Sequence, residues 1–416
     1  MMDEIIVTIE KLIFGGDALA HLPDGRAIFI PFVLPGETVR IRLVEDKPRF
    51  ARGIPVEIIQ ASPERITPKC PHFTTCGGCH YQHIPYERQV EFKLEILRDQ
   101  LIRIGKLQDP PLRKIISSPA PWNYRNNIQF HPSFDGDLCF MDVQGMDLVP
   151  IHECHLPLVG ITEVWPQIKL ESDSGISRLS FRQDSREEIM LLLEGEDEIA
   201  PDFEMDMSIS AAHLNGYGEI TNLAGEDALL FQVSDHDLRV SPESFFQVNT
   251  AQAENMVSYV KNILSTHTPN LKILELFSGV GLFSIILAAY AEKLVAIESS
   301  PSACFDFAIN LDQYDNIDLY EGEVEEILPG LDFAPDLVLV DPPRSGLDKE
   351  ARLALLNMNC PEIIYLSCDP ATLARDLKYF IEAGYELSEI LAFDLFPQTY
   401  HIESISHLVR RQEIHE

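Results

Sequence analysis

Three apolar runs in the C-terminal part of the chain end in residues that could do chemistry. One run ends in Ser-Cys at Cys368, and Pro370 prevents the strand from continuing. A second run ends in an Asp-Pro-Pro turn at Asp341, and a third, Leu271–Leu276, ends in a glycine turn. Enzymes with parallel α/β sheets place their chemistry at such strand ends. A glycine loop, a carboxylate and a thiol at three strand ends suggest a methyl transfer in which a cysteine activates the acceptor.

The glycine turn has the features of a cofactor site. Its two glycines follow Phe277 and precede an expected helix over 283–289, so the backbone can approach a ligand closely. The next expected strand, 294–297, ends in Glu298, where a carboxylate can accept the two ribose hydroxyls. These features fit NAD or S-adenosylmethionine, whereas a nucleoside triphosphate is disfavoured because a Walker lysine is missing. The Asp341 turn favours S-adenosylmethionine, since such turns line methyltransferase acceptor sites.

A compact cysteine loop predicts a metal centre. Cys70, Cys76 and Cys79 have the spacing C-x5-C-x2-C, with two glycines that let the backbone wrap tightly. Four thiolates are the usual complement, so a fourth ligand is needed. Cys154 is the best candidate, and Cys139 is its rival, although a strand-like apolar run around Cys139 favours a buried free cysteine. The spacing alone leaves zinc and an iron–sulfur cluster open.

Length and charge limit the classes of protein that fit. A chain of 416 residues is too long for one ordinary core, so we expect two or three domains. Residues 1–130 hold 17 basic and 15 acidic residues, a net charge of +2. The whole chain has a net charge of −34, so the remaining residues have a net charge of −36. Such an acidic chain is a poor general nucleic-acid binder, so the N-terminal third should carry most of any affinity for RNA. No apolar run is long enough to span a membrane, no signal peptide is visible, and we expect a cytoplasmic monomer.

Periodicity predicts three domains. Residues 1–61 show short strands and glycine turns typical of a small OB-like barrel, with basic residues and Phe50 that could contact RNA. Residues 62–235 form a central α+β domain with the cysteine loop, and a helix over 85–105 could dock on the catalytic domain. Residues 236–416 alternate strands and helices, the pattern of a doubly wound, Rossmann-like α/β domain.

Together these motifs resemble the RNA (uracil-5-)-methyltransferases, in the branch with an N-terminal TRAM domain and an iron–sulfur cluster. The resemblance covers nearly the whole chain. Its strongest segments are Phe-Phe-Gln-Val-Asn (245–249), Glu-Leu-Phe-Ser-Gly-Val-Gly (275–281), Asp-Pro-Pro-Arg-Ser-Gly (341–346), Ser-Cys-Asp-Pro-Ala-Thr-Leu-Ala-Arg-Asp (367–376) and Phe-Pro-Gln-Thr-Tyr-His-Ile-Glu (396–403).

The resemblance implies roles for individual residues. Cys368 would be the nucleophile that adds to C6 of a uracil, and Glu403 would be the proton acceptor at C5. Such a nucleophile needs the thiolate, so we expect a lowered pKa for Cys368. The cofactor contacts would be Gln247, Phe277, Glu298, Glu323 and Asp341. The ligands of a [4Fe–4S] cluster would be Cys70, Cys76, Cys79 and Cys154.

Alternative functions differ in what they require of the sequence. The favoured substrate is a uridine of 23S ribosomal RNA, and the same chemistry on the T-loop uridine of transfer RNA is the first alternative. An amino-nitrogen methyltransferase would use a similar Pro-Pro turn but would not need Cys368. A non-catalytic RNA-binding protein would need neither Cys368 nor Glu403 and would not bind S-adenosylmethionine.

Overall fold

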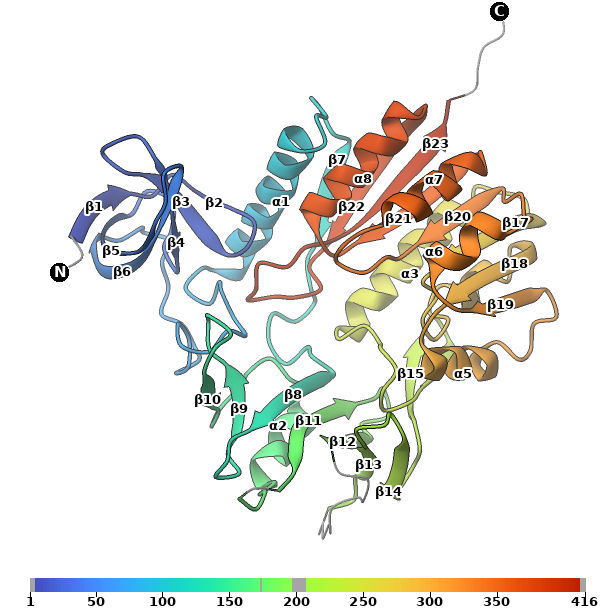
Figure 1. Cartoon of the computed structure of the whole chain (residues 1–416), viewed down its shortest axis with the longest axis horizontal. Helices are drawn as coiled ribbons and strands as arrows, with labels where there is room; N and C mark the ends of the chain where they lie inside the picture. Colours follow the sequence, from blue (N-terminus) through green and yellow to red (C-terminus); the bar gives the residue numbers. More distant parts are fainter. Residues whose placement is uncertain (1–3, 173, 197–206, 412–416) are drawn as a thin grey trace, which may run out of the picture.

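The computed structural model describes residues 4–172, 174–196 and 207–411. Three larger sheets follow one another along the chain: blue N-terminal strands, green central strands, and an orange-to-red sheet from the C-terminal half (Figure 1). No helix in these ranges is long and apolar enough to cross a membrane.

The N-terminal sheet arises from short Val- and Ile-rich segments between glycine turns. Its strands are β1 (Glu4–Thr8), β2 (Lys11–Leu12), β3 (Asp17–His21), β4 (Ala27–Pro31), β5 (Thr38–Asp46) and β6 (Phe50–Gln60), in the order β1-β5-β6-β4-β3-β2. Alternate side chains, such as Ile28 and Ile30, are fully buried, as expected for strands with one face in a core. The predicted OB-like domain is confirmed.

The central sheet has seven strands. They are β8 (Asn127–Pro132), β9 (Leu138–Met141), β10 (Leu148–Pro150), β11 (Ile176–Gln183), β12 (Ile189–Gly195), β13 (Ser210–Leu214) and β14 (Ile220–Ala224), in the order β10-β9-β8-β11-β12-β13-β14. Helices α2 (Val159–Val164) and η1 (Trp165–Gln167) are also part of this region. The rings of Phe130, Trp165 and Phe181 contact one another in its core.

The C-terminal half forms an eight-stranded sheet. Its strands are β17 (Leu271–Leu276), β18 (Ala291–Glu298), β19 (Ile317–Glu321), β20 (Leu337–Val340), β21 (Glu362–Ser367), β22 (Tyr385–Phe393) and β23 (Glu403–Arg410), with β7 (Leu112–Ile116) at the edge beside β22. The order is β19-β18-β17-β20-β21-β23-β22-β7, and β17 to β21 are parallel. The helices are α3 (Thr250–Leu264), α4 (Ser284–Leu287), α5 (Pro301–Asn310), α6 (Val324–Ile327), η2 (Leu328–Gly330), α7 (Lys349–Asn357) and α8 (Pro370–Glu382). The predicted doubly wound fold is confirmed.

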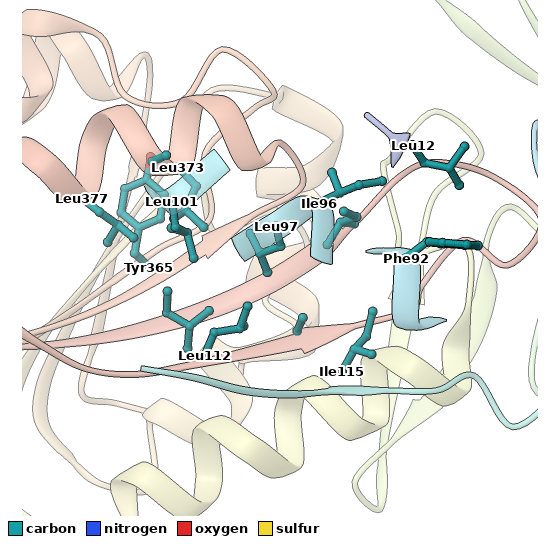
Figure 2. Packing of buried hydrophobic residues seen from close by; sticks show 14 of the residues in the cluster. Leu12, Phe92, Ile96, Leu97, Leu101, Leu112, Ile115, Tyr365, Leu373 and Leu377 are labelled. Atoms are coloured by element: carbon teal, nitrogen blue, oxygen red, sulfur yellow. The ribbon is translucent and has the colours of Figure 1, made fainter. Parts of the chain in front are cut away.

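Helix α1 (Tyr86–Arg103) packs between the N-terminal sheet and the catalytic sheet. Figure 2 shows Leu97 and Leu101 of this helix beside Leu373 and Leu377 of α8, with Leu12 of the N-terminal sheet at the other end of the cluster. These side chains are buried, so their contacts bury apolar surface that would otherwise meet water. The helix therefore joins two regions that are far apart in sequence.

The expected domain boundary at 235/236 falls inside a hairpin. Strands β15 (Leu229–Val233) and β16 (His236–Val240) pair antiparallel across that position. Since Phe231 of β15 stacks on Phe246, the hairpin contributes to the core of the catalytic half.

Candidate active site and cysteine cavity

The topology of the catalytic sheet gathers the predicted residues at one edge. The parallel strands β17, β18, β20 and β21 all end there, which brings Phe277, Glu298, Asp341 and Cys368 to the same side. The chain order reverses between β17 and β20, the position where doubly wound sheets bind ligands. Strand β23 runs antiparallel to β21, so its first residue, Glu403, lies at this same edge. The pairing of Ser367 with Ser404 sets the thiol and the carboxyl opposite each other.

A cavity of about 700 Å³ opens at this edge of the sheet. Its lining includes all seven residues predicted for catalysis and cofactor binding, namely Gln247, Phe277, Glu298, Glu323, Asp341, Cys368 and Glu403. Cys368 is half-buried and so can be reached from the cavity. Residues outside the quoted motifs also line it, among them Glu243, Ser299 and Ser300. Ser299 and Ser300 follow Glu298 directly, which is the signal that could have identified them.

Backbone amides hold the carboxylate of Glu298 in place. One oxygen accepts hydrogen bonds from the amides of Ser299 (2.9 Å) and Ser300 (2.8 Å). The other accepts from the amide of Gly279 at 2.8 Å. Gly279 has φ +54°, and Phe277 has φ +63°, a conformation that costs energy for a residue with a side chain. The strained turn and Glu298 therefore form one preorganised unit.

The acidic groups of this region are hard to ionise in the free protein. Burial raises the pKa of Glu275 to about 8, even though the Ser284 hydroxyl donates a hydrogen bond to it. Burial and the charge of Glu298 raise the pKa of Asp341 to about 7. Burial and Asp341 also raise the pKa of Glu403 well above its ordinary value. A cation that entered the cavity would favour the charged forms of all three.

The expected low pKa of Cys368 is wrong for the free protein. Burial, followed by the negative charges of Glu403 and Asp341, raises the pKa of the thiol to about 12, and Arg344 opposes this only in part. The helix that follows does not compensate, because Asp369 caps the first turn of α8 with its side chain. The thiolate therefore needs a further positive charge in the cavity.

Arg344 and His401 contact each other in the lining of the cavity. A guanidinium nitrogen of Arg344 lies 2.8 Å from Nδ1 of His401. Burial and the neighbouring Arg344 lower the pKa of His401 to about 3, so its ring is neutral. The ring also contacts Phe396 and Tyr400, and Phe245 lies 69% exposed on the cavity wall.

The segment with Gln247 is held from two sides. Asn126 of the central region donates a hydrogen bond to the carbonyl of Gln247 at 2.8 Å. The fully buried Asp306 of α5 accepts from the amide of Ser241 and from the hydroxyl of Ser244, at 2.7 Å each. The backbone of 241–247 is therefore fixed relative to the sheet.

The four predicted ligand cysteines line a second cavity, of about 440 Å³. They are Cys70, Cys76, Cys79 and Cys154. Burial raises the pKa of all four thiols, to about 12 for Cys79 and about 11 for Cys154. Cys139 is instead buried in β9, where its thiol donates to the carbonyl of Asp137.

Polar groups around this cavity suit bound thiolates. The amide of Gly78 donates to the sulfur of Cys76 at 3.3 Å. A hydrogen bond from Gln82 and the positive charge of Arg125 oppose the effect of burial on Cys79. Within the described residues, no three Cys, His, Asp or Glu side chains stand close enough together to bind a single metal ion.

The basic residues of the N-terminal sheet are partly neutralised. Arg40 forms an ion pair with Glu57, and Arg52 forms one with Asp17. Lys47 lies 3.4 Å from Glu45. Exposed pairs of this kind leave less free positive charge for RNA phosphates than the sequence had suggested.

The fold and the strand-end cavity define a doubly wound methyltransferase with an OB-like domain. Comparison with known families agrees: the family tRNA (Uracil-5-)-methyltransferase matches residues 226–411, and the TRAM domain matches residues 3–56. An uncharacterized RNA methyltransferase of Aquifex aeolicus is 32% identical over 96% of this chain and 97% of its own. Another, of Gloeobacter violaceus, is 32% identical over 98% of this chain and 96% of its own.

A solved structure resembles the whole chain. It is the tRNA (uracil-54, C5)-methyltransferase of Pyrococcus abyssi in complex with S-adenosyl-L-homocysteine, with a TM-score of 0.75, 26% identity, and coverage of 97% of this chain and 100% of that one. The protein belongs to the TRAM-containing RNA (uracil-5-)-methyltransferases, which are S-adenosylmethionine-dependent enzymes.

Proposed function

We propose that the protein methylates C5 of a uridine in a structured RNA, with Cys368 as nucleophile and Glu403 as proton acceptor. The observation that carries this proposal is the antiparallel pairing of β21 and β23, which sets these two side chains opposite each other in one cavity. A nucleophile at C6 and a base at C5 must act on adjacent atoms of one ring. Residues from two paired strands meet that requirement.

The chemistry follows from the weakness of uracil C5 as a nucleophile. The Cys368 thiolate adds to C6 and pushes electron density onto C5. C5 then attacks the methyl group, the sulfur–methyl bond breaks, and S-adenosylhomocysteine leaves. The carboxylate of Glu403 takes the C5 proton, the C5–C6 double bond re-forms, and the bond between C6 and sulfur breaks to return the thiolate. The target base must leave its stack to reach this cavity, and Phe245 is placed to stack on it.

The cofactor supplies the positive charge that the thiol needs. The described lining of the cavity contains five carboxyl groups, of Glu243, Glu298, Glu323, Asp341 and Glu403, against the single guanidinium of Arg344. S-adenosylmethionine carries a sulfonium, and a nearby cation lowers the pKa of a thiol and of a carboxyl alike. We infer that cofactor binding ionises Cys368 and Glu403 together. Gln247, Phe277, Glu298, Glu323 and Asp341 would contact the cofactor, with Glu298 on the ribose hydroxyls.

We propose that the cysteine cavity holds a [4Fe–4S] cluster. Four thiols around one space, an amide donor to Cys76 and the cation of Arg125 fit an anionic cluster with four cysteine ligands. The cluster would be structural, and no step of the methyl transfer requires it.

We propose 23S ribosomal RNA as the substrate, as the family resemblance favours. The second candidate is the T-loop of transfer RNA, which the similarity to the Pyrococcus abyssi enzyme favours. Methyl-labelled S-adenosylmethionine with unmodified 23S ribosomal RNA and transfer RNA, each mapped to the nucleotide, tests both. Label as 5-methyluridine in one RNA assigns the substrate, whereas label on a nitrogen or no label in either would refute the proposal.

A further inference from the structure

Gln398 lies in the loop that leads to Glu403, next to the cysteine loop, and its side chain is almost fully buried. Its φ is +69°, a left-handed conformation that residues with side chains seldom adopt. Residues with such backbone angles persist only where the surroundings hold them. The surroundings here come from a part of the chain that is 277 or more positions away.

Every polar group of Gln398 bonds to residues between 80 and 121. Gln89 of α1 and Gln398 form a reciprocal pair: the Gln89 amide nitrogen donates to the Gln398 side chain, and the Gln398 backbone amide donates to the Gln89 side chain, at 2.9 Å each. The carbonyl of Gln398 accepts from the amides of His80 (2.8 Å) and Tyr81 (3.0 Å). Its side-chain nitrogen donates to the carbonyl of Pro121 at 3.3 Å.

The same elements hold the start of this loop. The buried ammonium of Lys93 on α1 lies 2.6 Å from Asp394 and donates to the carbonyl of Phe396 at 3.0 Å. Tyr124 donates to the carbonyl of Pro397 at 3.0 Å. Thus α1 and the residues beside the cysteine cavity set the path of the backbone into the active site.

The residues that depend on this path include the proposed proton acceptor. His401 and Glu403 follow Gln398 within five positions, and both line the catalytic cavity. Cys368 lies between β21 and α8, and the pairing of β21 with β23 reaches only to Ser367 and Ser404, so the loop before Glu403 has to be held by other contacts. The cofactor residues of β17 and β18 are separate, since Glu298 is fixed by its own backbone amides.

We propose that Gln89 and Gln398 are positioning residues. Their hydrogen-bonded pair, called the joint below, connects α1 and the cysteine loop to the loop before Glu403 and so fixes the position of the proton acceptor relative to C5. The proposal rests on the proposed function of Glu403. Loosening the joint moves the acceptor while the thiol and the cofactor stay in place. The step that suffers is proton removal and release of the thiol, so the covalent protein–RNA adduct accumulates.

The test is a single-turnover assay of Gln89→Met with methyl-labelled S-adenosylmethionine, on in vitro transcripts of 23S ribosomal RNA and transfer RNA. Methionine keeps the length and volume of the side chain but removes all its hydrogen bonds. Since a misplacement of ~1 Å can cost on the order of 100-fold, we expect elimination to slow by about tenfold or more. The fraction of protein in a denaturation-stable RNA adduct should rise, with affinity for S-adenosylhomocysteine unchanged.

Two further variants separate positioning from loss of stability. Leu97→Ala on the same helix removes packing against α8 but no bond to Gln398, so it should lower stability without raising the adduct fraction. Gln398→Met keeps the backbone bonds of the loop and remains available if Gln89→Met does not fold. If the two glutamines act as one joint, the double variant should be no worse than the more severe single variant.

The outcomes distinguish this proposal from the proposed function. If the adduct fraction of Gln89→Met equals that of the wild type or that of Leu97→Ala, the proposal that this pair positions Glu403 is wrong. Glu403→Gln is measured in parallel. If it turns over normally without adduct, the assignment of the base is wrong, whatever Gln89→Met does.

Discussion

The protein has two cavities that contain buried thiols, and the charged groups near the thiols differ between the two cavities. In the catalytic cavity, Cys368 faces the carboxyl groups of Glu403 and Asp341, which add to the effect of burial and hold the thiol in its neutral form. In the second cavity, burial again raises the pKa of all four thiols, but the nearby Arg125 guanidinium and backbone amides oppose this effect. The first environment suits a nucleophile that is activated only when a cation arrives. The second suits sulfurs that remain bound to a positive centre.

The two cavities also differ in how the fold builds them. The catalytic cavity stands on the ends of parallel strands, so its residues stay aligned whether or not a ligand is present. The cysteine cavity is built from loops at 70–79 and around 154, which lie outside the helices and strands. Cysteine-rich loops of this kind depend on the bound metal centre for their shape.

Removal of the catalytic thiol is the change that should have the largest effect and tests the role of the first cavity most directly. Cys368→Ala should lower turnover by on the order of a thousandfold or more, because loss of a covalent nucleophile removes the reaction path itself. The same variant should still bind S-adenosylhomocysteine, since the cofactor residues lie on other strands. Incorporation of labelled methyl groups and isothermal titration measure the two effects. Retained turnover would rule out the cysteine mechanism.

The second test separates the nucleophile from the base within one cavity. Glu403→Gln should lower turnover by about 10²- to 10⁴-fold, the usual contribution of a general base. Methyl transfer still occurs, because Cys368 and the cofactor residues are intact. The RNA therefore stays attached to the protein, which a denaturing gel with labelled RNA detects. A slow variant without adduct would place the base elsewhere.

The third test concerns the cysteine cavity. Purified anaerobically, the protein should be brown and contain about four irons, as a [4Fe–4S] cluster requires. Cys79→Ser should lower the iron content and the thermal stability. Cys139→Ser is the matched control, because a hydroxyl can keep the bond to the Asp137 carbonyl. A colourless zinc protein, or iron lost equally from both variants, would contradict the assignment.

The sequence predicted features that depend on local patterns, but it did not predict features that depend on contacts between distant segments. Glu298 and Cys368 come directly at the ends of apolar runs, so their positions were visible in the chain, and the family resemblance and fold class are confirmed. The meeting of Glu403 with Cys368 depends on β23 running antiparallel beside β21, which no local pattern indicates. The pKa of Cys368 was misjudged because it depends on the burial of the thiol and on acids from other strands. The Gln89–Gln398 pair, 309 positions apart, has no sequence signal.

The smallest expected effect is on the pH dependence of stability, and it comes from the buried acids near the cofactor site. It tests whether burial keeps these acids neutral. Burial raises the pKa of Glu275 from 4.5 to about 8, so the folded protein binds a proton there that the unfolded chain has released at neutral pH. Stability from this group is complete below pH 4.5 and is lost as the pH rises toward 8. Each pKa unit corresponds to about 1.4 kcal/mol, so the loss is on the order of a few kcal/mol.

Glu275→Gln should therefore lose less stability than the wild type between pH 5.5 and pH 8, because an amide keeps the hydrogen bond with Ser284 and cannot ionise. Urea unfolding at both pH values measures this, with the exposed Glu386→Gln as control. Asp341 titrates in the same window and leaves part of the slope in place. If Glu275→Gln and Glu386→Gln show equal slopes, burial does not raise the pKa of Glu275.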